Sequence, residues 1–261
     1  MDIDAYLRRI GVSGRPEPTL DSLAELASAH LRSVPFENLD IAAGRPLSLE
    51  PEAIFDKLVV RRRGGFCYEL NGLFGWLLRD LGFEVTLLAA QTVDPTSGDP
   101  GQERAHLVLL VDLDGRWLVD IGWGEVYRGP FALRAGNEHT DGGIASYRLD
   151  RLDGRWQIVE RHDDSLETNL KQIPGWRIAY RFDLTPHELP DFVDTCRWQE
   201  TESPFFTGHR FCTIATPYGR RTLMDDRLIV REGGTRTRRP VTDQEWPGLL
   251  EELFGVRDAL T

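Results

Sequence analysis

Cys67 is the residue of this sequence that is best placed to act as a nucleophile. It lies in the segment RGGFCYELNGLF, shortly after two glycines and directly before an apolar stretch of helical spacing. A thiol at a helix N-terminus is stabilised as a thiolate, because the helix dipole and the unpaired N–H groups favour negative charge. The same N–H groups could bind an oxyanion. The alternative is a buried, inert cysteine, which is the role that we expect for Cys196 and Cys212.

His106 and Asp120 could supply the base and the orienting group that a cysteine nucleophile requires. They flank the dipeptide Asp114-Gly115 almost symmetrically, and each lies in an apolar segment of β type. Because Asp-Gly between two such runs predicts a hairpin, we expect the two side chains to be cross-strand neighbours. The alternatives are a core histidine bonded to backbone and a turn residue at a strand end. We expect most of the other histidines at the surface; they are His30, His139, His162, His187 and His209.

The elements that would position these residues change in type along the chain. Residues 1–85 carry apolar side chains at helical spacing and predict a helical bundle that contains the cysteine. Residues 86–190 contain short β-branched and aromatic runs between Asp-Gly turns, which predict an antiparallel sheet or small barrel that contains the histidine and the aspartate. Residues 191–261 mix helical and strand patterns. The expected fold class is α+β, in three parts that share an interface.

Composition and charge narrow the classes of partner. The chain of 261 residues has a net charge of -11 and a pI near 5.1, which disfavours nucleic acid as a partner. Its basic cluster at Arg236, Arg238 and Arg239 is short, has acidic neighbours and is expected to be a solvated loop. Three widely spaced cysteines fit neither a disulfide framework nor a zinc motif. We therefore expect no bound metal. We find no apolar run that could span a membrane and no signal peptide, so we expect a cytoplasmic protein.

Four segments resemble the N-terminal signatures of arylamine N-acetyltransferases, in the family's order. They are VPFENLD (residues 34–40), RGGFCYELNGLF (63–74), AHLVLLV (105–111) and WLVDIGWG (117–124), and SPFF (203–206) is a further family feature. The resemblance implies a helical bundle, a β-barrel and an α/β lid, with a papain-like triad of Cys67, His106 and Asp120. It implies ping-pong transfer of an acetyl group from acetyl-CoA, through the cysteine, to an arylamine, arylhydrazine or arylhydroxylamine. Acetyl-CoA is then a substrate, and no permanently bound cofactor is expected.

Substrate contacts are expected from the same resemblance. Phe36 and Phe205 could supply apolar walls, and Ala105 directly precedes the histidine. Gly124 lacks a side chain, which would let the coenzyme approach the backbone. Core packing is the alternative for the two phenylalanines, and an ordinary turn is the alternative for the glycine. A homodimer is the assembly that we consider.

Other functions stay open at this stage. A related branch of the family forms macrolactams from polyketide chains with the same triad, and a cysteine hydrolase could also use it. A non-catalytic protein with a relic triad is the alternative from a different class, and the intact triad argues against it. The chain departs from the family's usual residues at Trp123, Arg104 and Ala105. The resemblance also implies an ion pair between Arg63 and Glu37, which would tie VPFENLD to the cysteine loop.

Overall fold

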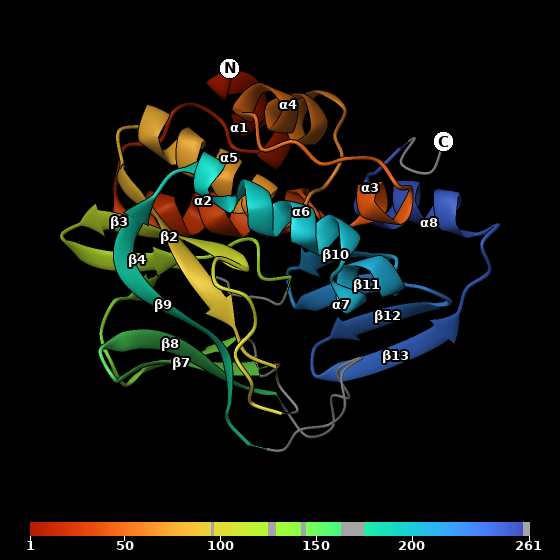
Figure 1. Cartoon of the computed structure of the whole chain (residues 1–261). Coiled ribbons are helices and arrows are strands. Elements are labelled where there is room, and N and C mark those ends of the chain that lie inside the picture. The colour runs from red at the N-terminus through yellow and green to blue at the C-terminus, as the bar shows by residue number, and fades with distance from the viewer. Residues whose placement is uncertain (95–96, 125–128, 142–144, 163–174, 258–261) are drawn as a thin grey trace.

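The computed structural model describes residues 1–94, 97–124, 129–141, 145–162 and 175–257 (Figure 1). Several helices gather at one end of the molecule, above two antiparallel sheets that lie side by side (Figure 1). Helices come first in the chain, then one sheet, and then a segment that combines helices with the second sheet. The predicted α+β fold class is therefore confirmed.

The first part of the chain is a bundle of helices with one short strand. Its elements are α1 (Ile3–Ile10), α2 (Leu20–Ser33), β1 (Phe36–Glu37), α3 (Leu39–Ala42), α4 (Pro51–Phe55), the π-helix η1 (Asp56–Val60) and α5 (Cys67–Asp80). Asp2 caps α1, and Thr19 caps α2. Helix α5 is buried along most of its length and packs against β2 (Glu84–Thr92) and β3 (His106–Leu113). The helix that begins at Cys67 is thus held against the strand that begins at His106.

An eight-stranded antiparallel sheet forms the second part. Besides β2 and β3 it contains β4 (Gly115–Val119), β5 (Phe131–Ala132), β6 (Asn137–Asp141), β7 (Ala145–Leu152), β8 (Arg155–His162) and β9 (Arg177–His187), in the order β5-β4-β3-β2-β9-β8-β7-β6. The edge strands β5 and β6 lie close to each other, so the sheet curls into a nearly closed barrel. Apolar side chains such as Leu88, Val108 and Tyr147 form its core.

The turn between β3 and β4 sets the register of the expected histidine–aspartate pair. Leu113 pairs with Gly115, and Leu109 pairs with Val119, so a single residue forms the turn. If this register is extended, Asp120 lies two residues from the position opposite His106. An offset of two residues keeps both side chains on one face, whereas a slip of one residue would have separated them. The tight turn therefore allows the two side chains to meet.

The third part combines short helices with a second sheet. Its elements are the 3-10 helix η2 (Leu189–Phe192), α6 (Val193–Thr201), α7 (Pro204–Gly208), β10 (Phe211–Thr216), β11 (Gly219–Met224), β12 (Arg227–Glu232), β13 (Thr235–Pro240) and α8 (Trp246–Phe254). The sheet has the order β1-β10-β11-β12-β13, so its first strand comes from the N-terminal part of the chain. Trp246 and other residues of α8 form a core with one face of this sheet.

Two features cross the expected boundaries between the three parts. Strand β1 pairs with β10, where Phe36 lies opposite Thr213. Phe192 and Cys196 belong to the core of the N-terminal helices, although they follow the barrel in the chain. The three parts therefore pack against one another directly. The division of the chain at residues 85 and 190 stays a prediction.

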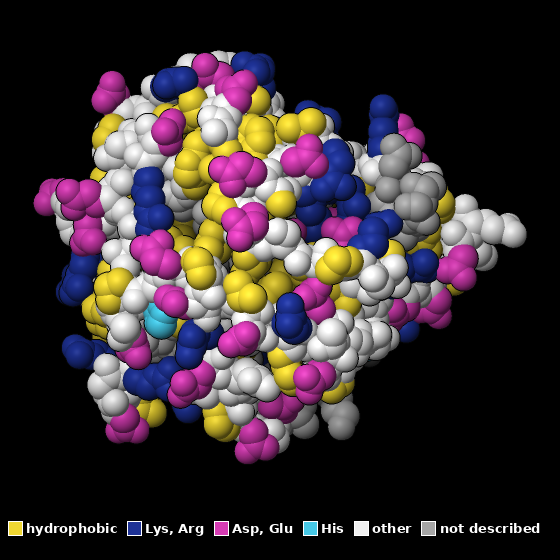
Figure 2. Space-filling view, turned by 45° about the horizontal axis from the view of Figure 1, so that its top comes forward, with side chains coloured by type: hydrophobic (Ala, Val, Ile, Leu, Met, Phe, Trp, Pro, Cys, Tyr) yellow, Lys and Arg dark blue, Asp and Glu magenta, His cyan; other side chains and the backbone are white. Residues whose placement is uncertain are grey.

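The surface gives two observations on partners. None of the helices within the described ranges is long and apolar enough to cross a membrane. On the face shown in Figure 2, Lys and Arg side chains are interspersed with Asp and Glu side chains. The basic cluster at residues 236–239 is not the loop that we expected, because it forms strand β13. Its Arg239 is paired with Glu245 at 2.9 Å.

His30 is an exception to the expectation that most of the histidines lie at the surface. It lies on α2 with 0% of its surface exposed, between the rings of Tyr6 and Phe74, whose centroids are 5.9 and 5.4 Å away. Neither ring nitrogen has a hydrogen-bond partner among the described residues. Burial, helped by the charge of Arg9, lowers the pKa of His30 to about 3. The folded state therefore holds this imidazole in its neutral form.

We expect the free energy of unfolding to fall as the pH falls from 6.5 toward about 3, because unfolded His30 binds a proton that folded His30 excludes. His30→Leu should remove this component from the pH dependence of the urea midpoint. His139→Leu, at an exposed histidine, should leave the component in place. The same pH dependence in His30→Leu and the parent protein would show that another group is responsible.

Candidate active site

Cys67 is the first residue of α5, and only 4% of its surface is exposed. The backbone N–H groups of Tyr68 and Leu107 favour negative charge on its sulfur. Burial raises the pKa of the Cys67 thiol well above its usual range, the nearby Cys196 and Asp120 act in the same direction, and the two N–H groups lower it. A thiolate at this position therefore depends on these donors and on a proton acceptor at hand.

The β3–β4 hairpin brings His106 and Asp120 into direct contact. His106 Nε2 and Asp120 Oδ2 are 2.7 Å apart, and the two side chains are 3% and 2% exposed. The predicted cross-strand pairing is therefore confirmed as a hydrogen bond between diagonal neighbours. A carboxylate at Nε2 selects the tautomer with hydrogen on that nitrogen, which leaves Nδ1 able to accept a proton.

Three further donors hold the Asp120 carboxylate. The side-chain amide of Asn71 donates to Oδ1 at 2.9 Å, and the backbone N–H of Gly122 donates to the same oxygen at 3.0 Å. The hydroxyl of Tyr180 donates to Oδ2 at 3.0 Å. Sequence reasoning missed both side chains. Asn71 stands one helical turn after Cys67, a spacing that could have revealed it, whereas Tyr180 on β9 carries no local signal.

The same contacts hold the start of α5, where Cys67 lies, beside the histidine–aspartate pair. The side-chain amide of Asn71 also donates to the carbonyl oxygen of Leu107, the residue directly after His106, at 2.7 Å. Gly122 lies so close to α5 that a Cβ on it would be 2.9 Å from the Cα atom of Cys67. The start of α5, the start of β3 and the end of β4 therefore converge on one buried place.

Trp123 forms a wall of this place. Its ring centroid is 5.0 Å from that of His106 and 5.0 Å from that of Tyr180. Both contacts are edge-on, an arrangement that is favourable for aromatic pairs. The residue that departs from the family's usual phenylalanine thus packs directly on the imidazole, and it restricts the directions in which that ring can turn.

Gly124 has a structural reason to be glycine. Its φ is 78°, and a Cβ there would lie 2.8 Å from the ring of Phe36. Phe36 in turn stacks on Phe211, with 5.5 Å between the ring centroids. A larger residue at Gly124 would strain the backbone and displace Phe36. Its expected contact with the coenzyme stays a prediction, which substitution of this glycine cannot isolate.

The other two expected contact residues lie in different surroundings. Phe205 is 37% exposed, and its ring centroid is 5.4 Å from that of Phe211, so it joins the aromatic cluster that contains Phe36. Ala105 is buried, and its carbonyl oxygen accepts a hydrogen bond from Gln199 at 3.4 Å. Phe205 therefore offers an accessible apolar surface, whereas Ala105 anchors the start of β3 to α6.

The expected ion pair between Arg63 and Glu37 is confirmed. Arg63 Nη2 lies 2.9 Å from Glu37 Oε1, and the side chains are 5% and 0% exposed. The pair ties β1 to the loop that leads into Cys67.

Within the described ranges, no group of three or more His, Cys, Asp or Glu residues is arranged so that it could hold a metal ion.

Comparisons with known proteins give one consistent result. A sequence model described as N-acetyltransferase matches residues 19–259. An arylamine N-acetyltransferase from Mycolicibacterium smegmatis is 39% identical over 248 residues, which cover 90% of this chain and 84% of that protein. The solved arylamine N-acetyltransferase from Salmonella typhimurium has a TM-score of 0.88 and 30% identity, and the match covers 97% of this chain and 90% of that one.

A second solved relative was determined with a bound ligand. It is the arylamine N-acetyltransferase of Mycobacterium marinum in complex with CoA, with a TM-score of 0.85, 31% identity, and coverage of 98% of this chain and 93% of that one. These proteins resemble the chain in both sequence and fold, and each match covers at least 84% of both proteins. The chain belongs to the arylamine N-acetyltransferase family.

Proposed function

We propose that this protein transfers an acetyl group from acetyl-CoA to an arylamine, arylhydrazine or arylhydroxylamine through a thioester on Cys67. The observation that carries the proposal is the buried hydrogen bond between His106 and Asp120, 2.7 Å long, which is packed against the helix that begins at the cysteine. Membership of the arylamine N-acetyltransferase family supports the reaction class. Acetyl-CoA is a substrate, and no permanently bound cofactor takes part.

In the first half-reaction, His106 Nδ1 takes the proton of the Cys67 thiol, and Asp120 stabilises the resulting imidazolium. The thiolate attacks the carbonyl carbon of acetyl-CoA. The carbon–sulfur bond to the coenzyme then breaks, and CoA leaves with the proton that the imidazolium returns. Burial favours this exchange, because charge that moves between adjacent groups in a water-poor site avoids the reorganisation of solvent.

In the second half-reaction, the amine nitrogen attacks the acetyl-cysteine carbonyl. His106 accepts a proton from the amine, and Cys67 leaves as a thiolate. We propose that Phe36 and Phe205 contact the aromatic ring of the acceptor, and that Gly124 and Ala105 border the acyl group and the coenzyme. The exposure of Phe205 and its link to Phe36 through Phe211 support the first of these assignments.

Two alternatives use the same three residues. A macrolactam-forming amide synthase would take a polyketide chain from a carrier protein, and a hydrolase would pass the acyl group to water. Acetyl-CoA with a panel of arylamines and hydrazines separates the three. Acetylated amine supports the proposal, CoA release that needs no amine supports the hydrolase, and inertness toward acetyl-CoA supports the amide synthase.

A cytoplasmic location and a homodimer stay predictions. Sedimentation velocity tests whether the protein is a homodimer.

Cys67→Ala should lose all detectable acetyl transfer, because no other group of the site can hold the acyl intermediate. The matched control is Cys212→Ala, which removes a fully buried thiol from the core next to α8 and should retain the activity of the parent protein. Steady-state assays with acetyl-CoA and one arylamine measure both. Substantial turnover by Cys67→Ala would exclude the thioester route.

Tyr180→Phe should lower kcat/KM about ten-fold or more, because the lost hydrogen bond to a charged group contributes about 1.5–3 kcal/mol. The effect should appear as slower alkylation of Cys67 at neutral pH, since a less firmly held Asp120 orients His106 less well. Tyr218→Phe, at a tyrosine that is 75% exposed, serves as the control. Equal alkylation rates in Tyr180→Phe and the parent would remove Tyr180 from the set of positioning residues.

A further inference from the structure

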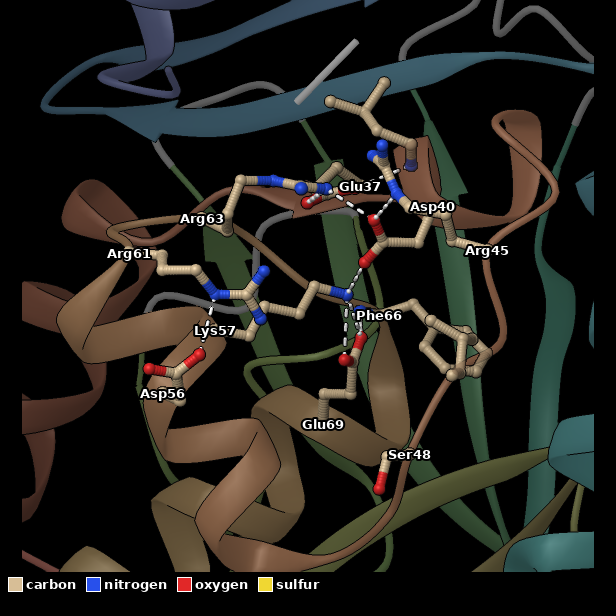
Figure 3. Close-up of polar contacts among 12 residues, drawn as sticks. Glu37, Asp40, Arg45, Ser48, Asp56, Lys57, Arg61, Arg63, Phe66 and Glu69 are labelled. Carbon is tan, nitrogen blue, oxygen red and sulfur yellow. Dashed lines mark hydrogen bonds and ion pairs between the residues drawn. The ribbon is translucent and has the colours of Figure 1, made fainter. Parts of the chain in front are cut away.

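A cluster of charged side chains is buried beside the loop that leads into Cys67. We define the charged cluster as Glu37, Asp40, Lys57, Arg63 and Glu69, and Figure 3 shows how their side chains point toward one another. All but Asp40 belong to the buried residues, and the side chain of Asp40 is 13% exposed. Buried charges persist only where opposite charges and hydrogen bonds compensate the loss of water, so the arrangement must be specific.

Lys57 stands at the centre of this cluster. Its Nζ atom lies 2.7 Å from Asp40 Oδ2, and 2.8 and 3.0 Å from the two carboxylate oxygens of Glu69. Burial lowers the pKa of Lys57, but the carboxylates of Glu69, Glu37 and Asp40 outweigh burial and raise it above its ordinary value. Lys57 therefore carries a positive charge over the whole range of pH in which the enzyme would work.

Glu69 connects this charge to the nucleophile. It is the third residue of α5, two residues after Cys67, and its Oε2 accepts a hydrogen bond from the backbone N–H of Phe66 at 3.1 Å. This bond holds the residue before Cys67 against the first helical turn. Burial raises the pKa of Glu69, whereas the charge of Lys57 lowers it. Without Lys57, the carboxylate would be an uncompensated buried charge in the turn that carries the thiol.

We propose that Lys57 is a positioning residue for Cys67: it holds Glu69 at the N-terminus of α5 and cancels the carboxylate's charge beside the thiolate. This inference rests on the proposed role of Cys67 as the nucleophile. Arg63 has a different task, because its contacts run to Glu37 at 2.9 Å and to Asp40 at 3.2 Å, on the side of β1 and α3. Removal of Arg63 would loosen that strand, whereas removal of Lys57 changes the charge balance of the catalytic turn itself.

Other ionisable groups face the same region and must stay constant in a test. Arg45, next to α3, contacts Asp40 Oδ1 at 2.9 Å, and Cys196 on α6 lies near both Lys57 and Glu69. His106 and Asp120, which are hydrogen-bonded to each other, complete the set. Substitutions confined to Lys57 and Glu69 leave these four groups in place.

The experiment measures the rate of Cys67 alkylation by iodoacetamide against pH, by peptide mass spectrometry, with melting temperatures recorded in parallel. Lys57→Met should move the midpoint upward by about one pH unit, the size expected for one nearby charge at an effective dielectric constant of about 20. Glu69→Gln should move the midpoint downward. The double variant Lys57→Met/Glu69→Gln should return close to the parent value, because the amide carries no charge and its oxygen can still accept from Phe66.

Two controls separate charge from stability. Arg61→Met removes the same charge from an exposed ion pair of the same segment, where Arg61 Nε and Asp56 Oδ2 are 2.7 Å apart (Figure 3), and should leave the midpoint unchanged. Leu58→Ala opens a cavity under the same π-helix and should lower the melting temperature without moving the midpoint.

Opposite shifts in the two single variants support the proposal, because a purely structural role would move both midpoints the same way or neither. The proposal is overturned if Lys57→Met lowers the melting temperature and keeps the parent midpoint, as Leu58→Ala should. If Lys57→Met does not fold, an unchanged midpoint in Glu69→Gln overturns it equally. Alkylation needs no acetyl-CoA, so failure of the acetyl-transfer proposal would be seen separately, in the parent protein.

Discussion

The buried carboxylate of Asp120 is the constraint on which the rest of the site depends. An unpaired carboxylate at this depth would cost several kcal/mol, yet four donors surround it: His106, Asn71, Tyr180 and the backbone N–H of Gly122. They come from β3, α5, β9 and the loop after β4. To satisfy one anion, the helical part and two distant strands of the barrel must therefore dock in a single arrangement.

Helix α5 is held from both sides, which explains how a residue at its first position can be placed accurately. On the barrel side, Asn71 bonds to Asp120 and to the carbonyl group of Leu107. On the opposite side, Glu69 bonds to the ammonium group of Lys57 and to the backbone of Phe66. Polar networks of this kind are unfavourable when incomplete, so partial docking of the helix gains little, and the complete arrangement is strongly preferred.

The parts of the site that the sequence could predict were those with local signals. The flanks of Cys67 and the turn at Asp114 indicated a nucleophile and a hairpin, and the hairpin pairing is observed. Tyr180 lies 60 residues from Asp120 on another strand, so no spacing could reveal it. Nothing in the sequence singles out Lys57, because the burial of a lysine depends on carboxylates that only tertiary packing supplies.

The fold was predictable to a similar degree. The change from helical to strand patterns indicated the α+β class, but it could not show that Phe36 and Glu37 form an edge strand for a sheet whose other strands begin at Phe211. The burial of His30 had a local signal that our expectation did not use. His30 lies on the face of α2 that carries Leu23, Leu26 and Ala27, and the rings of Tyr6 on α1 and Phe74 on α5 pack against it.

In the proposed mechanism a thioester on Cys67 links the two half-reactions, and peptide mass spectrometry can detect it. The protein is incubated with acetyl-CoA without amine, digested at low pH and analysed by peptide mass spectrometry, before and after addition of an arylamine. Ping-pong transfer predicts one acetyl group on the peptide that contains Cys67, and its quantitative transfer to the amine. Acetylation at another residue, or turnover with an unmodified Cys67 peptide at every stage, would contradict it.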